Sequence, residues 1–316
     1  MITEGQIKET PGFKFDNEQT PYARQGKEVY ALLRSKETTE AQIQAVLDEV
    51  MSLAQQQGVE DALVTSTDVF MTCICHIGSK SLSHVLSSIE KSKNRLLAIG
   101  SASEAARREI ITAVTEYWSI APGTAVNIID KLLNYTIITP MSVIEWALHD
   151  HLDRGRALTK GFIYEMVAST MNKVTNRVRQ IVAARNDPSL SNDQRSLYED
   201  TLVRERQSMR DLFTAIEDAV SGVANAADDE MIERYDGEES EMALLQSWGE
   251  RWARVWRRRA IVEEAMVGEV AVDLQAFAAA AAAKTAAEEN SIVNANANPA
   301  TGGGGDETLI DADDIA

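Results

Sequence analysis

The chain of 316 residues is longer than one ordinary domain of roughly 100 to 200 residues, so two domains or one elongated array both fit. Hydrophobic residues make up 44% and charged residues 25%, as in soluble folded proteins. The net charge of −18 opposes non-specific attraction to phosphate backbones. The composition therefore excludes a protein that wraps nucleic acid by charge alone.

Cysteine usage and apolar runs indicate the compartment. The only two cysteines, Cys73 and Cys75, are too close in sequence for an ordinary disulfide within a helix, which fits a reducing compartment. The first residues lack an apolar stretch of signal-peptide length, and no run of about 18 apolar residues occurs. We expect a soluble, non-secreted protein with no membrane partner.

Residues 1–25 carry Pro11, Gly12, Pro21 and scattered charges without a helical period. This pattern predicts a linker or an extended arm. A chain that begins in such sequence is expected to be a truncated fragment of a longer protein. We place a helical-repeat domain at residues 26–272.

Apolar residues recur three and four positions apart from Gly26 onward, which is typical of amphipathic helices. Thr39 is a suitable N-cap for the second helix, Pro122 and Pro140 can begin helices, and Gly58, Gly78 and Gly100 can end them. The remaining helices are expected at residues 61–77, 80–99, 103–120, 122–137, 142–151, 157–185 and 194–223. Because strand patterns are almost absent, the fold is predicted to be all-α.

The second half is expected to contain a long helical hairpin, residues 157–223, and a helix with Trp248, Trp252 and Trp256 on one face. Residues 273–316 follow as an Ala-rich helix and then an acidic, Gly-rich tail that cannot bury enough apolar surface to fold. Helix pairs of about 35 to 45 residues predict a HEAT-like or ARM-like solenoid of antiparallel pairs. A plain helical bundle is the alternative.

Two polar clusters contain residue types that can form metal or acid/base sites. Cys73, Cys75 and His76, with His84, resemble metal ligands, but helix positions two apart diverge by about 200°, so core cysteines are the simpler interpretation. The second cluster, which is favoured as solvated capping residues over an acid/base or metal site, contains His149, Asp150, His151 and Asp153.

No nucleophile, phosphate-loop or zinc-protease motif occurs. We therefore expect no enzyme and no cofactor.

A basic run overlaps the tryptophan helix: Arg254, Arg257, Arg258 and Arg259. These arginines could stack on RNA bases with Trp252 and Trp256, bind an acidic partner or act as a weak nuclear import signal. Buried tryptophans with arginines extended around them are the simpler interpretation.

Four segments resemble a known family: PYARQGKEVYALLRSKETTEAQI at Pro21–Ile43, SKSLSHVLSSIEK at Ser79–Lys91, a longer block at Glu116–Leu148, and GFIYEMVASTMNKV at Gly161–Val174. The longer block contains Tyr-Trp-x3-Pro, then Ile-Ile-Asp-Lys, then a tryptophan. The chain looks like the C-terminal, third helical-repeat domain of the large subunit of the nuclear mRNA cap-binding complex, whose domains resemble the middle domain of translation initiation factor 4G. The residues that carry this signature are Trp118, Pro122, Ile129 and Trp146.

The resemblance implies a non-enzymatic scaffold. In that family the large subunit holds a small subunit with an RNA-recognition motif, which contacts the capped RNA, and the complex serves splicing, processing, export and nonsense-mediated decay. It also implies a nuclear protein that shuttles to the cytoplasm and binds processing and export factors. The first two domains of the family have no counterpart here. The alternative is a generic helical-repeat adaptor unrelated to the cap.

A partner-binding face is expected on the helix that follows Gly78. Lys80, Ser83 and His84 occupy its polar side. The simpler interpretation of these residues is an ordinary solvated helix surface.

Overall fold

The computed structural model describes residues 11–225 and 239–268, which are helical with no strand among them. The all-α prediction is confirmed. The α-helices are α1 (Ala23–Arg34), α2 (Glu40–Gln56), α3 (Ala62–Ile77), α4 (Leu82–Lys91), α5 (Lys93–Ala102), α6 (Glu104–Tyr117), α7 (Pro122–Asn134), α8 (Pro140–Glu145), α9 (Gly161–Arg185), α10 (Asn192–Ala224) and α12 (Glu239–Val267). Short helices are η1 (Lys14–Asp16), the π-helix η2 (Trp146–Asp150) and η3 (Asp153–Thr159).

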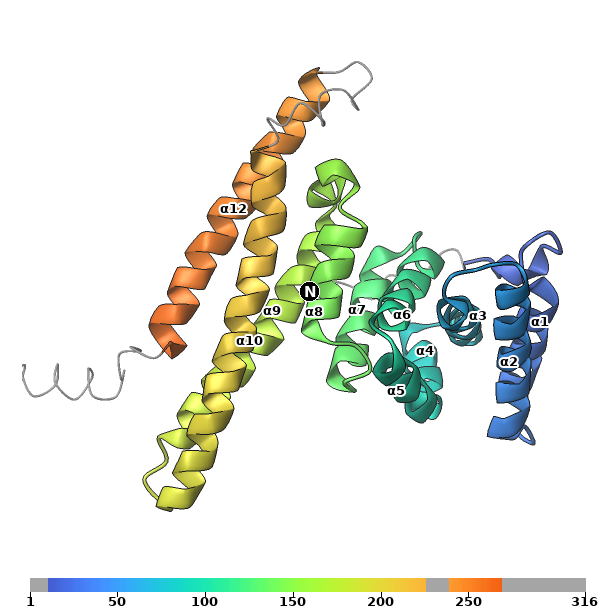
Figure 1. The fold of residues 1–316 in the computed structure, drawn as a ribbon, viewed down its shortest axis with the longest axis horizontal. Helices are drawn as coiled ribbons and strands as arrows, with labels where there is room; N and C mark the ends of the chain where they lie inside the picture. The colour runs from blue at the N-terminus through green and yellow to red at the C-terminus, as the bar shows by residue number, and fades with distance from the viewer. Residues whose placement is uncertain (1–10, 226–238, 269–316) are drawn as a thin grey trace, which may run out of the picture. The chain divides into compact units, whose positions relative to one another are not determined.

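The helices pack largely against their neighbours in sequence, as in helical-repeat proteins. Helix α3 contacts α1, α2, α4 and α6; α7 contacts α9; and α9, α10 and α12 pack together. Figure 1 shows this succession from α1 to α12. The core is correspondingly continuous and runs from Phe13 to Val267.

Helix starts follow the predicted chemistry. Thr39 forms a capping box with Gln42 at the start of α2, and Pro122 and Pro140 occupy the first positions of α7 and α8. Ser191 makes a further capping box at the start of α10. The segment between α9 and α10 is therefore a short, well-defined turn.

Two of the three predicted terminal glycines end helices. Gly58 follows α2 with a φ of 75°, and Gly78 follows α3. The prediction for Gly100 was wrong, because α5 continues to Ala102. A Cβ atom on Gly100 would collide with the carbonyl oxygen of Ile137, so glycine here permits close backbone approach.

The boundary predicted at residue 26 is also wrong. Helix α1 begins at Ala23, and residues 11–22 fold against the helical body in place of the expected linker. Phe13 stacks on His76 with ring centroids 4.3 Å apart, and Phe15 lies against Gly26, where a Cβ atom would collide with its ring. Two aromatic residues in a segment without helical period carry this packing, so periodicity did not reveal it.

Two further expected helices are divided. Residues 80–99 form α4 and α5, which meet at Ser92, and residues 142–151 form α8 and then η2. Before α9, Arg154 and Gly155 adopt left-handed conformations with φ of 54° and 95°. The chain thereby changes direction before the hairpin.

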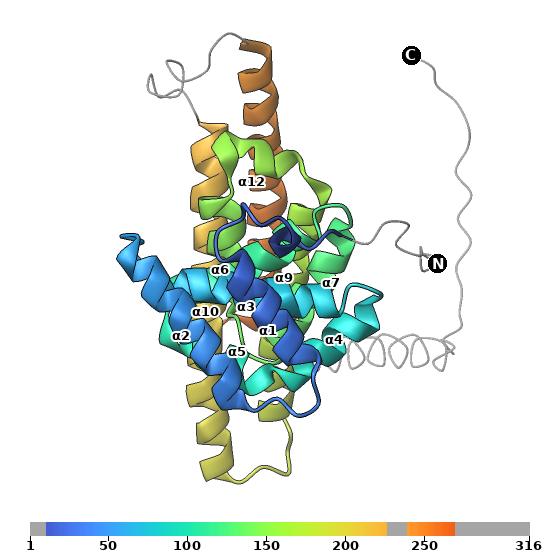
Figure 2. The ribbon, with the colours of Figure 1, turned by 90° about the vertical axis from the view of Figure 1, so that its right-hand side faces the viewer.

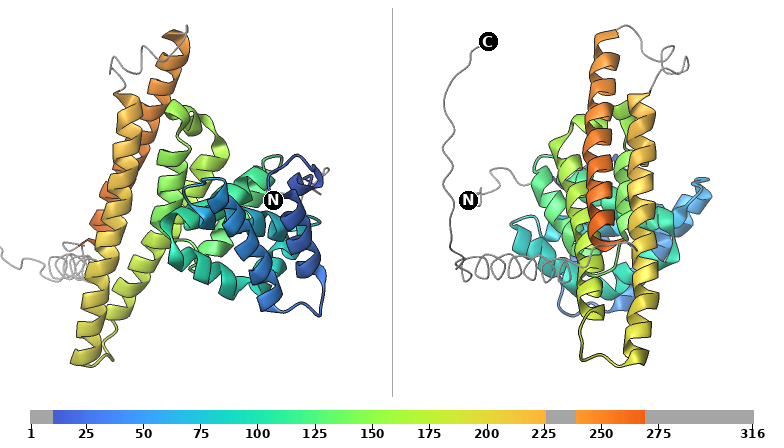
Figure 3. Two further views of the ribbon diagram at one scale, coloured as in Figure 1. Left: turned by 45° about the vertical axis from the view of Figure 1, so that its right-hand side comes forward. Right: turned by 90° about the vertical axis from the view of Figure 1, so that its left-hand side faces the viewer.

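The predicted hairpin is confirmed as α9 and α10. Its turn extends beyond the helices of the N-terminal half (Figure 2). Helix α12 lies against both arms (Figure 3). The interval 226–238, the predicted Ala-rich helix and the predicted tail at 273–316 lie outside the described residues. No helix in the described ranges is long and apolar enough to cross a membrane.

Candidate functional site

The two cysteines are core residues, as interpreted from the sequence. Both are fully buried and unpaired, and burial raises the pKa of the Cys75 thiol to about 12. Burial also raises the pKa of Cys73. A thiol held protonated in this way is neither a good nucleophile nor a metal ligand.

His76, at the end of α3, is a packing residue. Its ring stacks on Phe13, and its Nδ1 lies 2.9 Å from the Tyr117 hydroxyl. Burial lowers the pKa of His76, so the neutral imidazole is favoured. His84 is on another helix and is exposed, so the structure does not bring the two histidines together.

The structure brings together only part of the polar cluster around His149, whose Nδ1 lies 3.1 Å from a carboxylate oxygen of Asp150. The His149 side chain is exposed, whereas His151 stacks on Trp146 with ring centroids 4.1 Å apart. Asp150 pairs with Arg108 at 3.0 Å, and Asp153 is exposed. Within the described ranges no group of three or more His, Cys, Asp or Glu residues could hold a metal ion.

The signature residues hold consecutive helices together. Trp118 and Ile129 are buried, and Trp146 is buried with its indole N–H donating to the Thr112 hydroxyl at 3.0 Å. Pro122 begins α7. These four residues pack the fold and offer no chemistry to a ligand.

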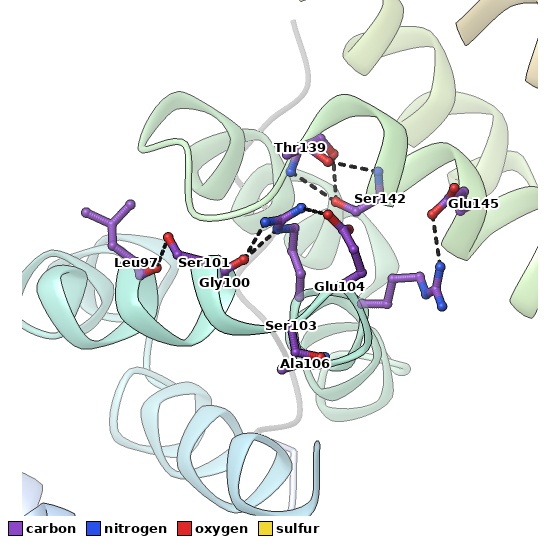
Figure 4. Close-up of polar contacts among 11 residues, drawn as sticks. Leu97, Gly100, Ser101, Ser103, Glu104, Ala106, Thr139, Ser142 and Glu145 are labelled. Carbon is purple, nitrogen blue, oxygen red and sulfur yellow. Dashed lines mark hydrogen bonds and ion pairs between the residues drawn. The ribbon is translucent and has the colours of Figure 1, made fainter. Parts of the chain in front are cut away.

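Helix α6 fixes the geometry around α8 through two consecutive arginines. Arg107 donates to the carbonyl oxygen of Gly100 and pairs with Glu104, while Arg108 pairs with Glu145 at 2.9 Å (Figure 4). Because neighbouring positions on a helix diverge, one arginine reaches back to α5 and the other reaches forward to α8. The pair therefore joins α5, α6 and α8.

Next to Arg108 the repeat meets the hairpin at a groove of about 470 Å³. Its floor on α10 is formed by small residues, and its other wall by apolar residues of α8 and η2; the lining includes Ile144, Leu148, Leu152, Ala215, Ala219 and Gly222. Arg108, Glu145 and Asp218 form its polar rim. Such a groove suits an apolar side chain of a protein partner more than a reaction centre.

The predicted partner face is accessible. Lys80, Ser83 and His84 are all exposed, but Lys80 precedes the N-cap Ser81 and only Ser83 and His84 lie in the first turn of α4. The Ser81 hydroxyl and His84 Nδ1 are 2.6 Å apart. Val85 and Ile89 form the buried side of α4, so these three polar side chains can be changed without disturbing the core.

The tryptophan helix is buried on the expected side. Trp252 and Trp256 lie in the core, Trp248 is half-buried, and the Trp252 indole N–H donates to the carbonyl oxygen of Leu158 at 3.0 Å. This burial removes both core tryptophans as platforms for RNA bases.

The basic run divides between two surfaces of α12. Arg257 pairs with Glu217 at 2.7 Å, and Arg259 donates to Asn172 on α9. Arg254 and Arg258 are exposed. In the sequence the four arginines form one run, although a rotation of 100° per residue already places Arg257 and Arg259 on different sides of α12.

Stacked helices with packed interiors define a helical-repeat protein. The chain belongs to the MIF4G-like family, whose model matches residues 13–265.

Curated relatives share a name. The chain is 28% identical to the nuclear cap-binding protein subunit 1 of Schizosaccharomyces pombe over 189 residues, which are 60% of this chain and 23% of that protein. It is 25% identical to the human protein of that name over 114 residues, 36% of this chain and 14% of the relative. The Salmo salar protein is 26% identical over 111 residues, 35% of this chain and 14% of the relative. The chain thus matches less than a quarter of each relative's length.

Proposed function

We propose that this chain is a non-enzymatic scaffold of a nuclear cap-binding complex. The observation that carries the proposal is the MIF4G-like match across residues 13–265, together with relatives named nuclear cap-binding protein subunit 1. The chain would correspond to the C-terminal, third helical-repeat domain of such a subunit. Because of this match, the proposal assigns the roles of the whole subunit to this chain.

Contact with the cap falls to a partner in this proposal. A small subunit with an RNA-recognition motif binds the methylated guanine of the capped RNA, and the scaffold holds that subunit in a binding-competent state. The net charge of −18 supports this division, because it opposes direct attraction to RNA phosphates. Capped RNA is then an indirect partner.

The exposed face of α4 is our proposed contact for the small subunit. Lys80, Ser83 and His84 offer hydrogen-bond donors at the start of the helix, and none of them is needed for the core. Factors for splicing, processing, export and nonsense-mediated decay would dock elsewhere on the complex. The protein would act in the nucleus and shuttle to the cytoplasm.

The test is capture on immobilised methylguanosine cap, using this chain alone and extended to its natural N-terminus, with and without the small subunit. Capture only in the presence of the small subunit supports the scaffold. If the extended chain is not captured with the small subunit either, the cap-complex proposal fails and a generic helical-repeat adaptor takes its place.

The α4 face has its own test. The Lys80→Glu/His84→Glu variant is expected to lower capture of the small subunit by at least about tenfold, because it reverses the local charge at the contact. Glu60→Lys, an exposed residue after α2, serves as the charge-changing control. Equal capture by the α4 variant and the unchanged chain would remove α4 from the interface and leave the scaffold itself untouched.

A further inference from the structure

Helix α12 has a second surface that the other described residues leave largely exposed. Residues on it recur with alternating spacings of four and three: Leu244, Trp248, Arg251, Val255, Arg258 and Val262. We call these residues the outer stripe. Leu244 is 53% exposed, Val255 45% and Val262 47%.

The outer stripe is distinct from the buried side of α12. At 100° per residue, it is centred roughly 120° round the helix from the side that carries Trp252 and Trp256. That buried side packs on α10, η3 and α9. Half of the large hydrophobic residues exposed in the described ranges lie on α12, since Ile261 and Met266 accompany the three above. Single exposed apolar residues are ordinary, but an aligned series on one helix indicates an interaction surface.

Its spacing is the heptad spacing of a coiled-coil seam. Trp248, Val255 and Val262 stand seven apart in one line, and Leu244, Arg251 and Arg258 stand seven apart in the adjacent line. A helix laid along the stripe would therefore meet an apolar line and a line with two arginines. From residue 244 to 262 the seam is roughly 27 Å long, at 1.5 Å per residue.

The two arginines are available for a partner. The Arg251 guanidinium lies over the Trp248 ring, 5.2 Å from its centroid, and makes no ion pair within the described part of the chain. Arg258 is exposed and likewise has no ion-pair partner among the described residues. In contrast, Arg254 and Arg257 beside them are already paired, with Glu250 and Glu217.

Together these features specify the occupant. We infer that the outer stripe of α12 docks an acidic amphipathic helix of a partner protein, with aliphatic residues against Val255 and Val262 and carboxylates against Arg251 and Arg258. A charged pair closed off from water is favourable only when both members are present, so acids are required opposite the arginines.

Other occupants fit less well. In a parallel pair of two copies, Arg251 and Arg258 would face their own counterparts, and an antiparallel pair would bury guanidinium groups against valines. RNA would find few stacking surfaces, because the half-buried Trp248 is covered by Arg251. The proposal is independent of the cap-complex proposal, since it needs no RNA-recognition motif.

The test uses a synthetic 28-residue helical peptide with leucine at one heptad line and glutamate at the adjacent line, against the full chain, by fluorescence anisotropy. The control peptide carries lysine in place of each glutamate. We expect the glutamate peptide to bind at least about tenfold more tightly. Equal binding of the two peptides would overturn the proposal.

Variants then locate the site. Arg251→Glu/Arg258→Glu should weaken binding of the glutamate peptide at least about tenfold and strengthen binding of the lysine peptide. Val255→Asp/Val262→Asp should also weaken it. The matched control Lys36→Glu/Lys91→Glu makes the same charge change at exposed lysines of the N-terminal half and should alter affinity less than about twofold. If this control loses as much affinity, the attraction is non-specific charge and the proposal fails.

Two further measurements test the competing occupants. Replacing the acids of residues 228–230 or 311–314 by their amides should leave peptide affinity unchanged; a rise of about tenfold would make the chain's own acidic segment the occupant. Sedimentation should give the same mass for the full chain and the Arg251→Glu/Arg258→Glu variant, and a difference would indicate a second copy.

Small-subunit capture on cap resin is expected to be equal for the full chain and the Arg251→Glu/Arg258→Glu variant. Failure of the outer-stripe proposal is therefore distinguishable from failure of the cap-complex proposal.

Discussion

Helices α3 and α12 both carry strong apolar patterns, yet the chain uses them differently. Helix α3 is surrounded by α1, α2, α4 and α6, and every residue from Val69 to Cys75 is buried. Helix α12 is covered on one side, where Trp252 and Trp256 lie, and exposed along the outer stripe. A helix that is covered on all sides contributes only to packing. A helix that is covered on one side retains a surface that a partner can contact.

Ion pairs hold α12 to the hairpin, but burial supplies most of its attachment. Arg179 pairs with Glu263 at 2.6 Å and Arg210 with Glu264 at 2.5 Å. The partly exposed Arg210–Glu264 pair contributes about 0 to 1 kcal/mol, whereas the pair of Arg179 with the buried Glu263 mainly offsets the cost of burying that carboxylate. The buried indole of Trp256 is worth more than any of them, since removing a core tryptophan costs roughly 3 to 5 kcal/mol.

The largest expected effect therefore comes from the inner side of α12. Trp256→Ala should lower the free energy of unfolding by about 3 to 5 kcal/mol, because it leaves a cavity between α12, α9 and α10. Urea unfolding followed by circular dichroism measures it. Phe70→Ala in α3 is the matched comparison and should cost a similar amount. A loss below about 1 kcal/mol for Trp256→Ala alone would mean that α12 is not part of the cooperative core.

Arg206, on α10, binds the C-terminal end of α12. It is 5% exposed and donates to the carbonyl oxygens of Val267 and Gly268, the second at 2.8 Å. Arg206→Met should cost about 2 to 3 kcal/mol, because buried carbonyls lose their donors. Hydrogen exchange of residues 260–267 should become faster. Arg204→Met, at an exposed position two residues earlier, is the control and should leave both measurements unchanged; an equal effect there would contradict a specific role of Arg206.

Features of the fold that depend on local chemistry could be predicted from the sequence. Helix periods predicted the all-α fold and the α9–α10 hairpin, and the capping box at Thr39 located the start of α2. The sequence signature around Trp118 and Trp146 led to a family that the comparison supports in its broader form. Helix periods and caps depend on residues within one or two turns of one another, and the signature depends on residue types at fixed sequence spacings.

Features that depend on distant partners were not predictable in this way. Phe13 and Phe15 pack against His76 and Gly26, which no local period reveals. Gly100 is of a residue type that can end a helix, but its role is to allow close approach to Ile137. The outer stripe was missed for a related reason. Its heptad spacing is present in the sequence, but the three tryptophans dominate the pattern, and only the structure shows which side α10 covers. The contact proposed at Lys80, Ser83 and His84 stays a prediction.

A carboxyl group beside α3 should make stability depend on pH. Burial, and then Asp68 and Glu116, raise the pKa of Glu109 to about 8. In the unfolded chain the proton leaves near pH 4.5, whereas the folded chain retains it, so stability falls as the pH rises from about 4.5 through 8.

Glu109→Gln removes this dependence. At pH 5 the variant should match the unchanged chain, and at pH 9 it should be more stable by on the order of 2 kcal/mol. Thermal unfolding across that range measures the difference, with the exposed Glu60→Gln as the control. Parallel stability curves for the Glu109 variant and the unchanged chain would show that Glu109 is ionised in the folded protein.

The smallest expected effect concerns Val255, the neighbour of Trp256 in sequence. Val255→Ala should change the free energy of unfolding by less than about 0.5 kcal/mol, because a side chain that is 45% exposed leaves no cavity when it is shortened. The same urea titration that detects Trp256→Ala measures it. A loss above about 1.5 kcal/mol would mean that the outer stripe is already covered in the free protein, and then α12, like α3, would have no open side. The expected contrast between adjacent residues would instead confine the stability of α12 to its inner side and leave the outer stripe for a partner.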